Sequence, residues 1–139
     1  MADTVRDVMA ESPWHVEPSD SVEDAAKRMR DEDIGALLVV EDEELKGILT
    51  DRDIVVKAVA EGDKPGKAKV EDVCTADTTT VEADASIDDA IKAMREADVR
   101  RLPVVEDGKP VGIVTLGDLA MERDEDSALA DISAAAPNN

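Results

Sequence analysis

The chain has 139 residues, 42% of them apolar, which suffices for one ordinary domain or for two small repeats that share a core. It has no Phe or Tyr and a single Trp, so the core is aliphatic and large stacking surfaces are excluded. The formal charge of −19 repels nucleic acid and anionic membranes and is typical of a solvated acidic surface.

The N-terminus has no apolar signal region, and no stretch reaches the roughly 18 apolar residues that span a bilayer. We therefore expect a cytoplasmic protein. The single Cys74 has no second cysteine with which to form a disulfide or a metal motif, so we expect it to be a small buried apolar residue.

The sequence repeats itself after 65 residues. Val5 to Ile54 aligns with Val70 to Leu119 without a gap, and 21 of the 50 aligned positions are identical. This duplication predicts two copies of one βαββα unit. We place repeat 1 at 5–62, a Gly-, Pro- and Lys-rich linker at 63–69, repeat 2 at 70–124 and a flexible acidic and Ala-rich tail at 125–139.

Each copy begins with a short extended piece, at 15–17 and 80–82, followed by a Ser-x-x-Asp that resembles a capping box. Apolar residues then recur at i, i+3, i+4 and i+7 and predict one buried helix face in each copy. These residues are Val22, Ala25, Ala26 and Met29 in the first copy and Ile87, Ala90, Ile91 and Met94 in the second.

Two apolar runs come next in each copy and predict buried strands, at 36–40 and 47–50, then at 102–105 and 111–115. A helix is expected after the Thr that ends the second run, through residue 61 in the first copy. A three-stranded sheet with helices on one face leaves its other face apolar. The fold class is therefore α+β, with the two repeats packed sheet to sheet.

Each copy closes on Gly-Ile-x-Thr-x-x-Asp, which places Thr50 with Asp53 and Thr115 with Asp118 at helix starts. The Thr hydroxyl and the free amides there suit an anion or a ribose, and the carboxylate suits the ribose hydroxyls. The same spacing is that of a helix-capping pair, and the two roles are compatible.

The copies differ most in charge where Arg100 and Arg101 of the second stand opposite Gly35 and Ala36 of the first. A buried or half-buried Arg needs an anionic partner. That partner is either a surplus carboxylate of this acidic protein or the phosphate of a ligand.

The segments ADVRRLPVVEDGKPVGIVTLGDL and EDIGALLVVEDEELKGILTDRDI resemble a tandem CBS-domain pair, or Bateman module. The first copy also resembles stand-alone, two-repeat CBS proteins of the hypoxic response protein type. The resemblance implies pseudo-twofold symmetry and two clefts between the repeats for adenosine-containing ligands, namely AMP, ADP, ATP, S-adenosylmethionine or NAD. It also implies a homodimer.

Carried over by motif, the first cleft uses Thr115 and Asp118 toward phosphate and ribose, Ile113 beside the base, and Arg100 and Arg101 toward phosphate. The other copy lines that cleft with Ile34, Gly35 and Ala36, and with Asp20 and Ala25 nearby. The second cleft reuses Thr50, Asp53 and Ile48 and is lined by Val99 and Arg100. Because Gly35 and Ala36 carry no charge, the second cleft lacks these phosphate donors unless Arg52 supplies one, and we expect the clefts to be unequal.

The sequence offers little for catalysis. His15 is the only histidine and has no nucleophile or carboxylate at an interpretable spacing, and there is no metal motif or Walker-type loop. We therefore expect a regulatory nucleotide sensor without turnover, whose output passes through an unidentified effector protein or through a change in its own assembly. The alternative is a dimerisation and interaction module whose clefts stay empty.

Overall fold

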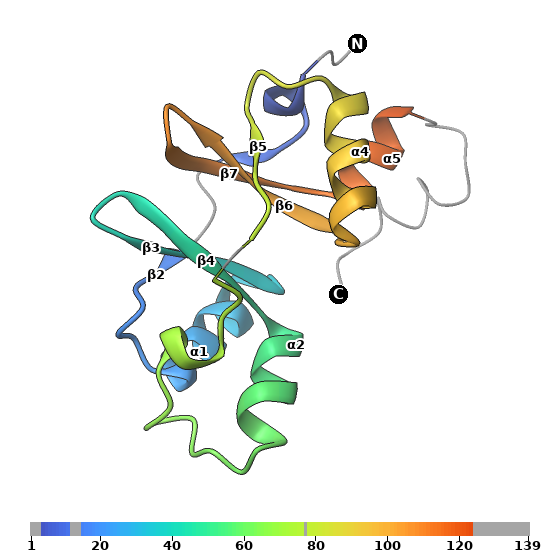
Figure 1. Cartoon of the computed structure of the whole chain (residues 1–139). Coiled ribbons are helices and arrows are strands. Elements are labelled where there is room, and N and C mark those ends of the chain that lie inside the picture. The colour runs from blue at the N-terminus through green and yellow to red at the C-terminus, as the bar shows by residue number, and fades with distance from the viewer. Residues whose placement is uncertain (1–3, 12–14, 77, 124–139) are drawn as a thin grey trace. The chain divides into compact units, whose positions relative to one another are not determined.

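The computed structural model describes residues 4–11, 15–76 and 78–123, which form two compact units (Figure 1). The first-repeat unit contains residues 15–76 and 78, and the second-repeat unit contains residues 4–11 together with 79–123. Both are mixed α and β, which confirms the predicted α+β class. The tail expected to be flexible, at 125–139, lies outside the described residues.

In the first-repeat unit, β2 runs parallel to β3, and β3 pairs with β4 as an antiparallel hairpin, giving the order β2-β3-β4. Four helical elements complete this unit. The strands are β2 (His15–Val16), β3 (Ala36–Glu41) and β4 (Glu44–Thr50), and the helices are α1 (Val22–Glu32), α2 (Asp51–Asp53), the π-helix η2 (Ile54–Val59) and α3 (Val70–Val73).

The second-repeat unit repeats this plan with one strand more, in the order β1-β7-β6-β5. The additional strand β1 pairs antiparallel with β7, so the expected three-stranded sheet has four strands here. The elements are the 3₁₀ helix η1 (Val5–Asp7), β1 (Ala10–Glu11), β5 (Val81–Glu82), α4 (Ile87–Ala97), β6 (Arg101–Glu106), β7 (Lys109–Thr115) and α5 (Leu116–Arg123).

Helices α1 and α4 begin and end alike. The Ser21 and Ser86 hydroxyls accept hydrogen bonds of 3.0 Å from the N–H groups of Asp24 and Asp89, which confirms the predicted N-caps. The predicted apolar faces are buried except at two positions. Ala26 is exposed and Ile91 is only half-buried, because a helix resting on a sheet buries a narrower stripe than the i+4 pattern allows.

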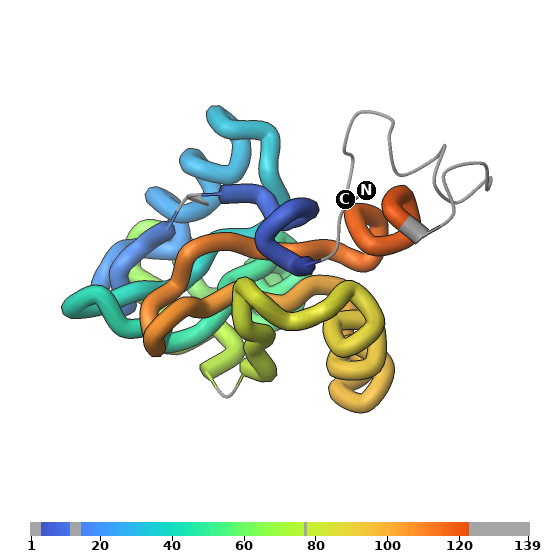
Figure 2. Tube along the Cα trace, turned by 90° about the horizontal axis from the view of Figure 1, so that it is seen from above, coloured from blue at the N-terminus to red at the C-terminus, as the bar shows by residue number. Residues whose placement is uncertain are grey.

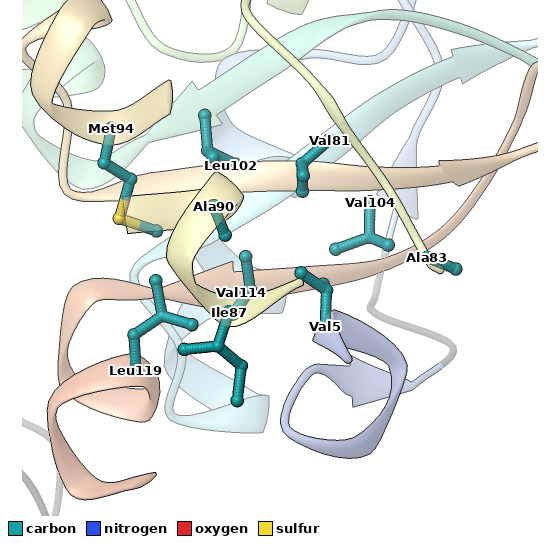
Figure 3. Close-up of a cluster of buried hydrophobic side chains, with 10 residues drawn as sticks. All are labelled: Val5, Val81, Ala83, Ile87, Ala90, Met94, Leu102, Val104, Val114 and Leu119. Carbon is teal, nitrogen blue, oxygen red and sulfur yellow. The ribbon is translucent and has the colours of Figure 1, made fainter. Parts of the chain in front are cut away.

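Each repeat contributes its opening segment to the core of the other repeat. We define the opening segments as residues 4–11 and 69–76. Val5 is fully buried among residues of the second repeat, including Ile87 and Val114 (Figure 3). Figure 2 shows the opening segment, in dark blue, running along β7, in orange. Val70 and Val73 are likewise buried in the core of the first-repeat unit.

Hydrogen bonds and ion pairs hold the first opening segment in place. The Val5 and Arg6 amides donate to the Ala85 and Ala83 carbonyls, each at 2.9 Å. The Arg6 guanidinium also pairs with the carboxylates of Asp84, at 3.0 Å, and Glu106. A compact unit is therefore not one continuous sequence repeat.

The shared glycine of Gly-Ile-x-Thr allows this close approach. A Cβ on Gly47 would lie 2.4 Å from the Thr75 carbonyl oxygen, and one on Gly112 would lie 2.7 Å from the Ala10 carbonyl oxygen. Real Cβ atoms do not come so near a backbone atom. The glycines are thus explained by the opening segments that cross them.

The segment 63–69, predicted as a linker, is hydrogen-bonded to the start of α1. The Val22 and Glu23 amides donate to the carbonyls of Ala68, at 2.9 Å, and Pro65, at 3.0 Å. These bonds satisfy amides at a helix start that have no partner within the helix.

Candidate functional site

The Thr and Asp that close each repeat form the same reciprocal pair in both units. The Thr50 amide donates to Asp53 Oδ2 at 3.0 Å, and the Asp53 amide donates to Thr50 Oγ1 at 3.1 Å. Thr115 and Asp118 reproduce both bonds at 3.0 and 3.1 Å. The capping interpretation is therefore confirmed. Each cap uses only the Oδ2 atom of the Asp. Whether the carboxylate can also bind a ligand therefore depends on what contacts its second oxygen, Oδ1.

The strand that precedes each pair lies directly beside it. Arg101 stands opposite Thr115 in the β6–β7 ladder, and the Leu116 amide donates to the Arg100 carbonyl at 2.7 Å. In the first-repeat unit Ala36 stands opposite Thr50 in the same way, and the Asp51 amide donates to the Gly35 carbonyl at 3.0 Å. In each unit the first residues of the central strand, β3 or β6, thus lie next to the Thr–Asp pair.

The two arginines make no ion pair with any carboxylate of the described residues. Arg100 is exposed just before β6, and Arg101 is half-buried at its first position. The surplus carboxylates of this part of the chain therefore do not serve as their partners. Two arginines without an ion-pair partner among the described residues therefore stand at the start of β6, whose first residue pairs with Thr115.

The remaining predicted residues divide between the two units. Ile48 and Ile113, nearly buried on β4 and β7, each lie opposite an opening segment, at Thr75 and Ala10. Ile34, Gly35, Ala36 and Asp20 belong to the first-repeat unit, and Val99 belongs to the second. The clefts predicted to combine residues of both repeats stay a prediction.

Asp20 has a local structural role. Its Oδ2 accepts the Glu17 amide at 2.9 Å, and its carbonyl accepts the Val70 amide at 2.9 Å. The side chain therefore closes the turn before α1 and holds the second opening segment. Ala25, placed nearby by the resemblance, is fully buried in the core, and Val99 is 39% exposed.

The amides at the two helix starts differ in whether they have acceptors. In the first-repeat unit the Arg52 amide donates to Asp51 Oδ1 at 2.8 Å, so the amides of residues 51, 52 and 53 all have acceptors. Across the described part of the chain the Gly117 amide, which matches Arg52, has none. The second-repeat unit therefore keeps one free backbone donor beside its two arginines.

The neighbours of Asp53 were not among the predicted site residues. Lys57 lies one helical turn further, with its Nζ 3.4 Å from Asp53 Oδ1. The Asp-x-x-x-Lys spacing in the sequence was the signal that could have identified this pair.

Cys74, expected to be buried, is only half-buried. Burial raises the pKa of its thiol, the Asp53 carboxylate raises it further, and Lys57 opposes the shift.

The described residues contain no group of three His, Cys, Asp or Glu side chains that could hold a metal ion. They also contain no helix that is both long and apolar enough to cross a membrane.

The family profile of the CBS domain matches residues 5–59 and 70–125. The chain belongs to the CBS-domain family. The CBS domain-containing protein YhcV of Bacillus subtilis is 37% identical over 134 residues, covering 94% of this chain and 95% of YhcV. Hypoxic response protein 1 of Mycobacterium tuberculosis is 41% identical over 118 residues, covering 84% of this chain and 82% of that protein. The predicted resemblance to this type of two-repeat CBS protein is confirmed.

Solved CBS structures have the same fold. The crystal structure of hypoxic response protein I, which has two coordinated zinc ions, matches with a TM-score of 0.77 and 41% identity, covering 84% of this chain and 96% of that one. The CBS domain pair of protein MJ0100, in complex with 5′-methylthioadenosine and S-adenosyl-L-methionine, matches with a TM-score of 0.79 and 28% identity, covering 89% and 98%.

Proposed function

We propose that this CBS-domain protein is a regulatory module that binds an adenosine-containing nucleotide at the second-repeat unit, without turnover. The observation that carries the proposal is the pair Arg100 and Arg101, unpaired among the described residues and adjacent to the Thr115–Asp118 cap. In a protein of charge −19, unpaired guanidinium groups beside a free backbone amide favour an anionic ligand.

The chemistry of this site suits a ribose followed by phosphates. Asp118 uses Oδ2 in the cap, and its Oδ1 has no hydrogen-bond partner in the described part of the chain. That oxygen is available to ribose hydroxyls, while the arginines suit the phosphates of AMP, ADP or ATP. The adenosine compounds in the structure of MJ0100 support the same ligand class, which also includes S-adenosylmethionine and NAD.

A thermal-shift panel of AMP, ADP, ATP, NAD and S-adenosylmethionine tests the ligand class. A ligand present at about 100 times its dissociation constant stabilises the folded state by about 2.7 kcal/mol, which raises the melting temperature measurably. No shift with any of the five would contradict nucleotide binding.

Calorimetry with ATP tests the site. We expect Arg101→Ala and Asp118→Ala each to weaken binding about tenfold or more, because a charge-assisted hydrogen bond contributes roughly 1.5–3 kcal/mol. Asp53→Ala should change it little. Arg95→Ala, which removes an exposed arginine of α4 in the same unit, is the matched control. Equal losses from the two Asp variants would contradict the assignment to the second-repeat unit.

A second candidate function is a dimerisation module with empty clefts. Exposed apolar side chains on the helices after β4 and β7 favour it, namely Val55, Val56 and Val59 on η2 and Leu116 and Met121 on α5. Apolar side chains grouped on one helix, as on η2, are typical of an interaction surface. We propose a homodimer in either case. Light scattering tests it. We expect the mass of a dimer for the full chain and for the surface control Lys27→Ala, and a lower mass for Val56→Lys. A monomeric mass for the full chain would contradict the proposal.

A further inference from the structure

Lys57 takes the carboxylate oxygen of Asp53 that the helix cap leaves open. Asp53 Oδ2 accepts the Thr50 amide at 3.0 Å, and the Lys57 ammonium lies 3.4 Å from Oδ1. The Asp53 side chain is only 13% exposed, whereas that of Lys57 is 46% exposed. The ammonium therefore covers a largely buried carboxylate from the solvent side.

A second contact fixes the position of the ammonium. Lys57 Nζ lies 3.5 Å from Thr75 Oγ1, a long hydrogen bond. Thr75 is itself anchored to β4, because its carbonyl accepts the Ile48 amide at 3.0 Å and its amide donates to the Ile48 carbonyl at 2.9 Å. Lys57 thus bridges the capped carboxylate and the opening segment that crosses the same strand.

The second-repeat unit has neither part of this bridge. With the offset of 65 residues, Glu122 stands in the place of Lys57, and Ala10, which has no hydroxyl, stands in the place of Thr75. The backbone is the same, since Ala10 pairs with Ile113 as Thr75 pairs with Ile48. The two units therefore share the capped carboxylate but differ in whether a cation already occupies it.

We propose that Lys57 is a specificity-determining residue: it occupies Asp53 and so closes the first-repeat unit to ribonucleosides, which leaves Asp118 as the open one of the two capping carboxylates. This inference rests on the proposed function. A ribose hydroxyl donates to a free carboxylate oxygen, but at Asp53 it would first have to displace an ammonium held by two groups. The charge at one side chain thereby sets the number of ligands bound.

Adenosine is the probe that isolates this effect. Removing Lys57 lowers the local positive charge, so the phosphates of ATP would be repelled at Asp53 even when the carboxylate is free. Adenosine is neutral and presents the same ribose. Methyl NMR of isoleucine-labelled protein follows each unit separately, through Ile48 on β4 and Ile113 on β7.

In the wild-type chain we expect adenosine to shift the Ile113 methyl resonance and not that of Ile48. In Lys57→Ala both should shift, and 2′-deoxyadenosine should leave Ile48 unmoved. Lys57→Arg keeps a cation over Asp53 and should behave as the wild type. Lys27→Ala is the matched control, because it breaks another i,i+4 ion pair of the first-repeat unit, with Glu23.

Each outcome decides something. A wild-type chain in which both methyls shift, or a Lys57→Ala variant in which only Ile113 shifts, overturns the role of Lys57 and leaves nucleotide binding standing. A wild type without an adenosine shift, together with a shift of Ile48 in Lys57→Ala, supports the role of Lys57 and contradicts Asp118 as a ribose acceptor. No adenosine shift in either protein overturns the role of Lys57, while calorimetry with ATP decides nucleotide binding at the arginines independently.

Discussion

The helix starts after β4 and β7 share one helix cap but differ in how the cations near the capping carboxylate are paired. Both carry the reciprocal Thr–Asp cap, with bonds of 3.0 and 3.1 Å in each unit. At Asp53 the second carboxylate oxygen is taken by Lys57, whereas the Thr115–Asp118 cap follows a strand paired with the one that Arg101 opens, and neither Arg100 nor Arg101 has an ion-pair partner among the described residues. Duplication can thus preserve a structural motif while its copies diverge in what they can bind, because the cap needs only one carboxylate oxygen.

Replacing the shared glycine by alanine should give the largest difference in stability between the two units. We expect Gly47→Ala to lower the free energy of unfolding by about 3 kcal/mol, because its Cβ meets the Thr75 carbonyl at 2.4 Å. Gly112→Ala should cost less, since its contacts lie at 2.7 Å and one is the flexible Met9 side chain. Urea unfolding measures both. Gly66→Ala, with no atom nearer than 3.9 Å, is the control, and a loss as large there would contradict the explanation.

Truncating the exchanged valines tests which core each opening segment stabilises. Val5→Ala and Val70→Ala each remove two methyl groups from a fully buried side chain and should lower the free energy of unfolding by about 2 kcal/mol. Hydrogen exchange should then accelerate at Val104 for Val5→Ala and at Val39 for Val70→Ala. The reverse pattern would show that each opening segment stabilises its own repeat.

Removing the caps should affect the two units equally. Thr50→Ala and Thr115→Ala each lose the side-chain acceptor for an amide at N3, which lowers the free energy of unfolding by about 1 kcal/mol. Thr→Ser at either position retains the hydroxyl and serves as the control. Thermal unfolding measures the loss. A difference between the two alanine variants well above 0.5 kcal/mol would mean that Thr50 or Thr115 has a structural role beyond capping.

Substitutions in the two hairpin turns should change the free energy of unfolding by less than removal of a cap does. Asp42 and Glu43 both adopt positive φ, of 55° and 65°, whereas the matched turn has Asp107 followed by Gly108, at 54° and 79°. Glu43→Gly should therefore raise the free energy of unfolding by about 0.5–1 kcal/mol, and Gly108→Ala should lower it by a similar amount. Urea midpoints check both signs, and a loss of stability in Glu43→Gly would contradict the argument.

The smallest expected effect concerns Cys74, which has Met9 as its counterpart in the other unit. Because burial raises the pKa of the Cys74 thiol, alkylation by iodoacetamide should reach half its maximal rate at a higher pH than that of glutathione. The raised pKa contributes stability that is present below the pKa of the unfolded thiol and is lost as the pH rises through the folded value. Cys74→Ala should remove this part of the pH dependence. Alkylation of Cys74 at or below the glutathione midpoint would contradict the shift.

Most local features of this protein can be predicted from its sequence. The repeat, the three strands common to both units, the caps at Ser21 and Ser86 and the Thr–Asp pairs follow from side-chain periodicity and from contacts three or four residues apart. The charge contrast of Arg100 and Arg101 with Gly35 and Ala36 was also visible in the alignment of the copies.

Only the tertiary structure decided which repeat each opening segment joins. Arg6 contacts Asp84 across 78 residues of sequence, and no local pattern distinguishes that pairing from one within the same repeat. Neither the role of the shared glycines nor the bridge from Lys57 to Thr75 could be predicted from the sequence. Both depend on an opening segment of one repeat that packs on β4 or β7 of the other. Local chemistry accounts for the elements, the caps and the Asp53–Lys57 pair, and long-range packing accounts for the repeat that each opening segment joins.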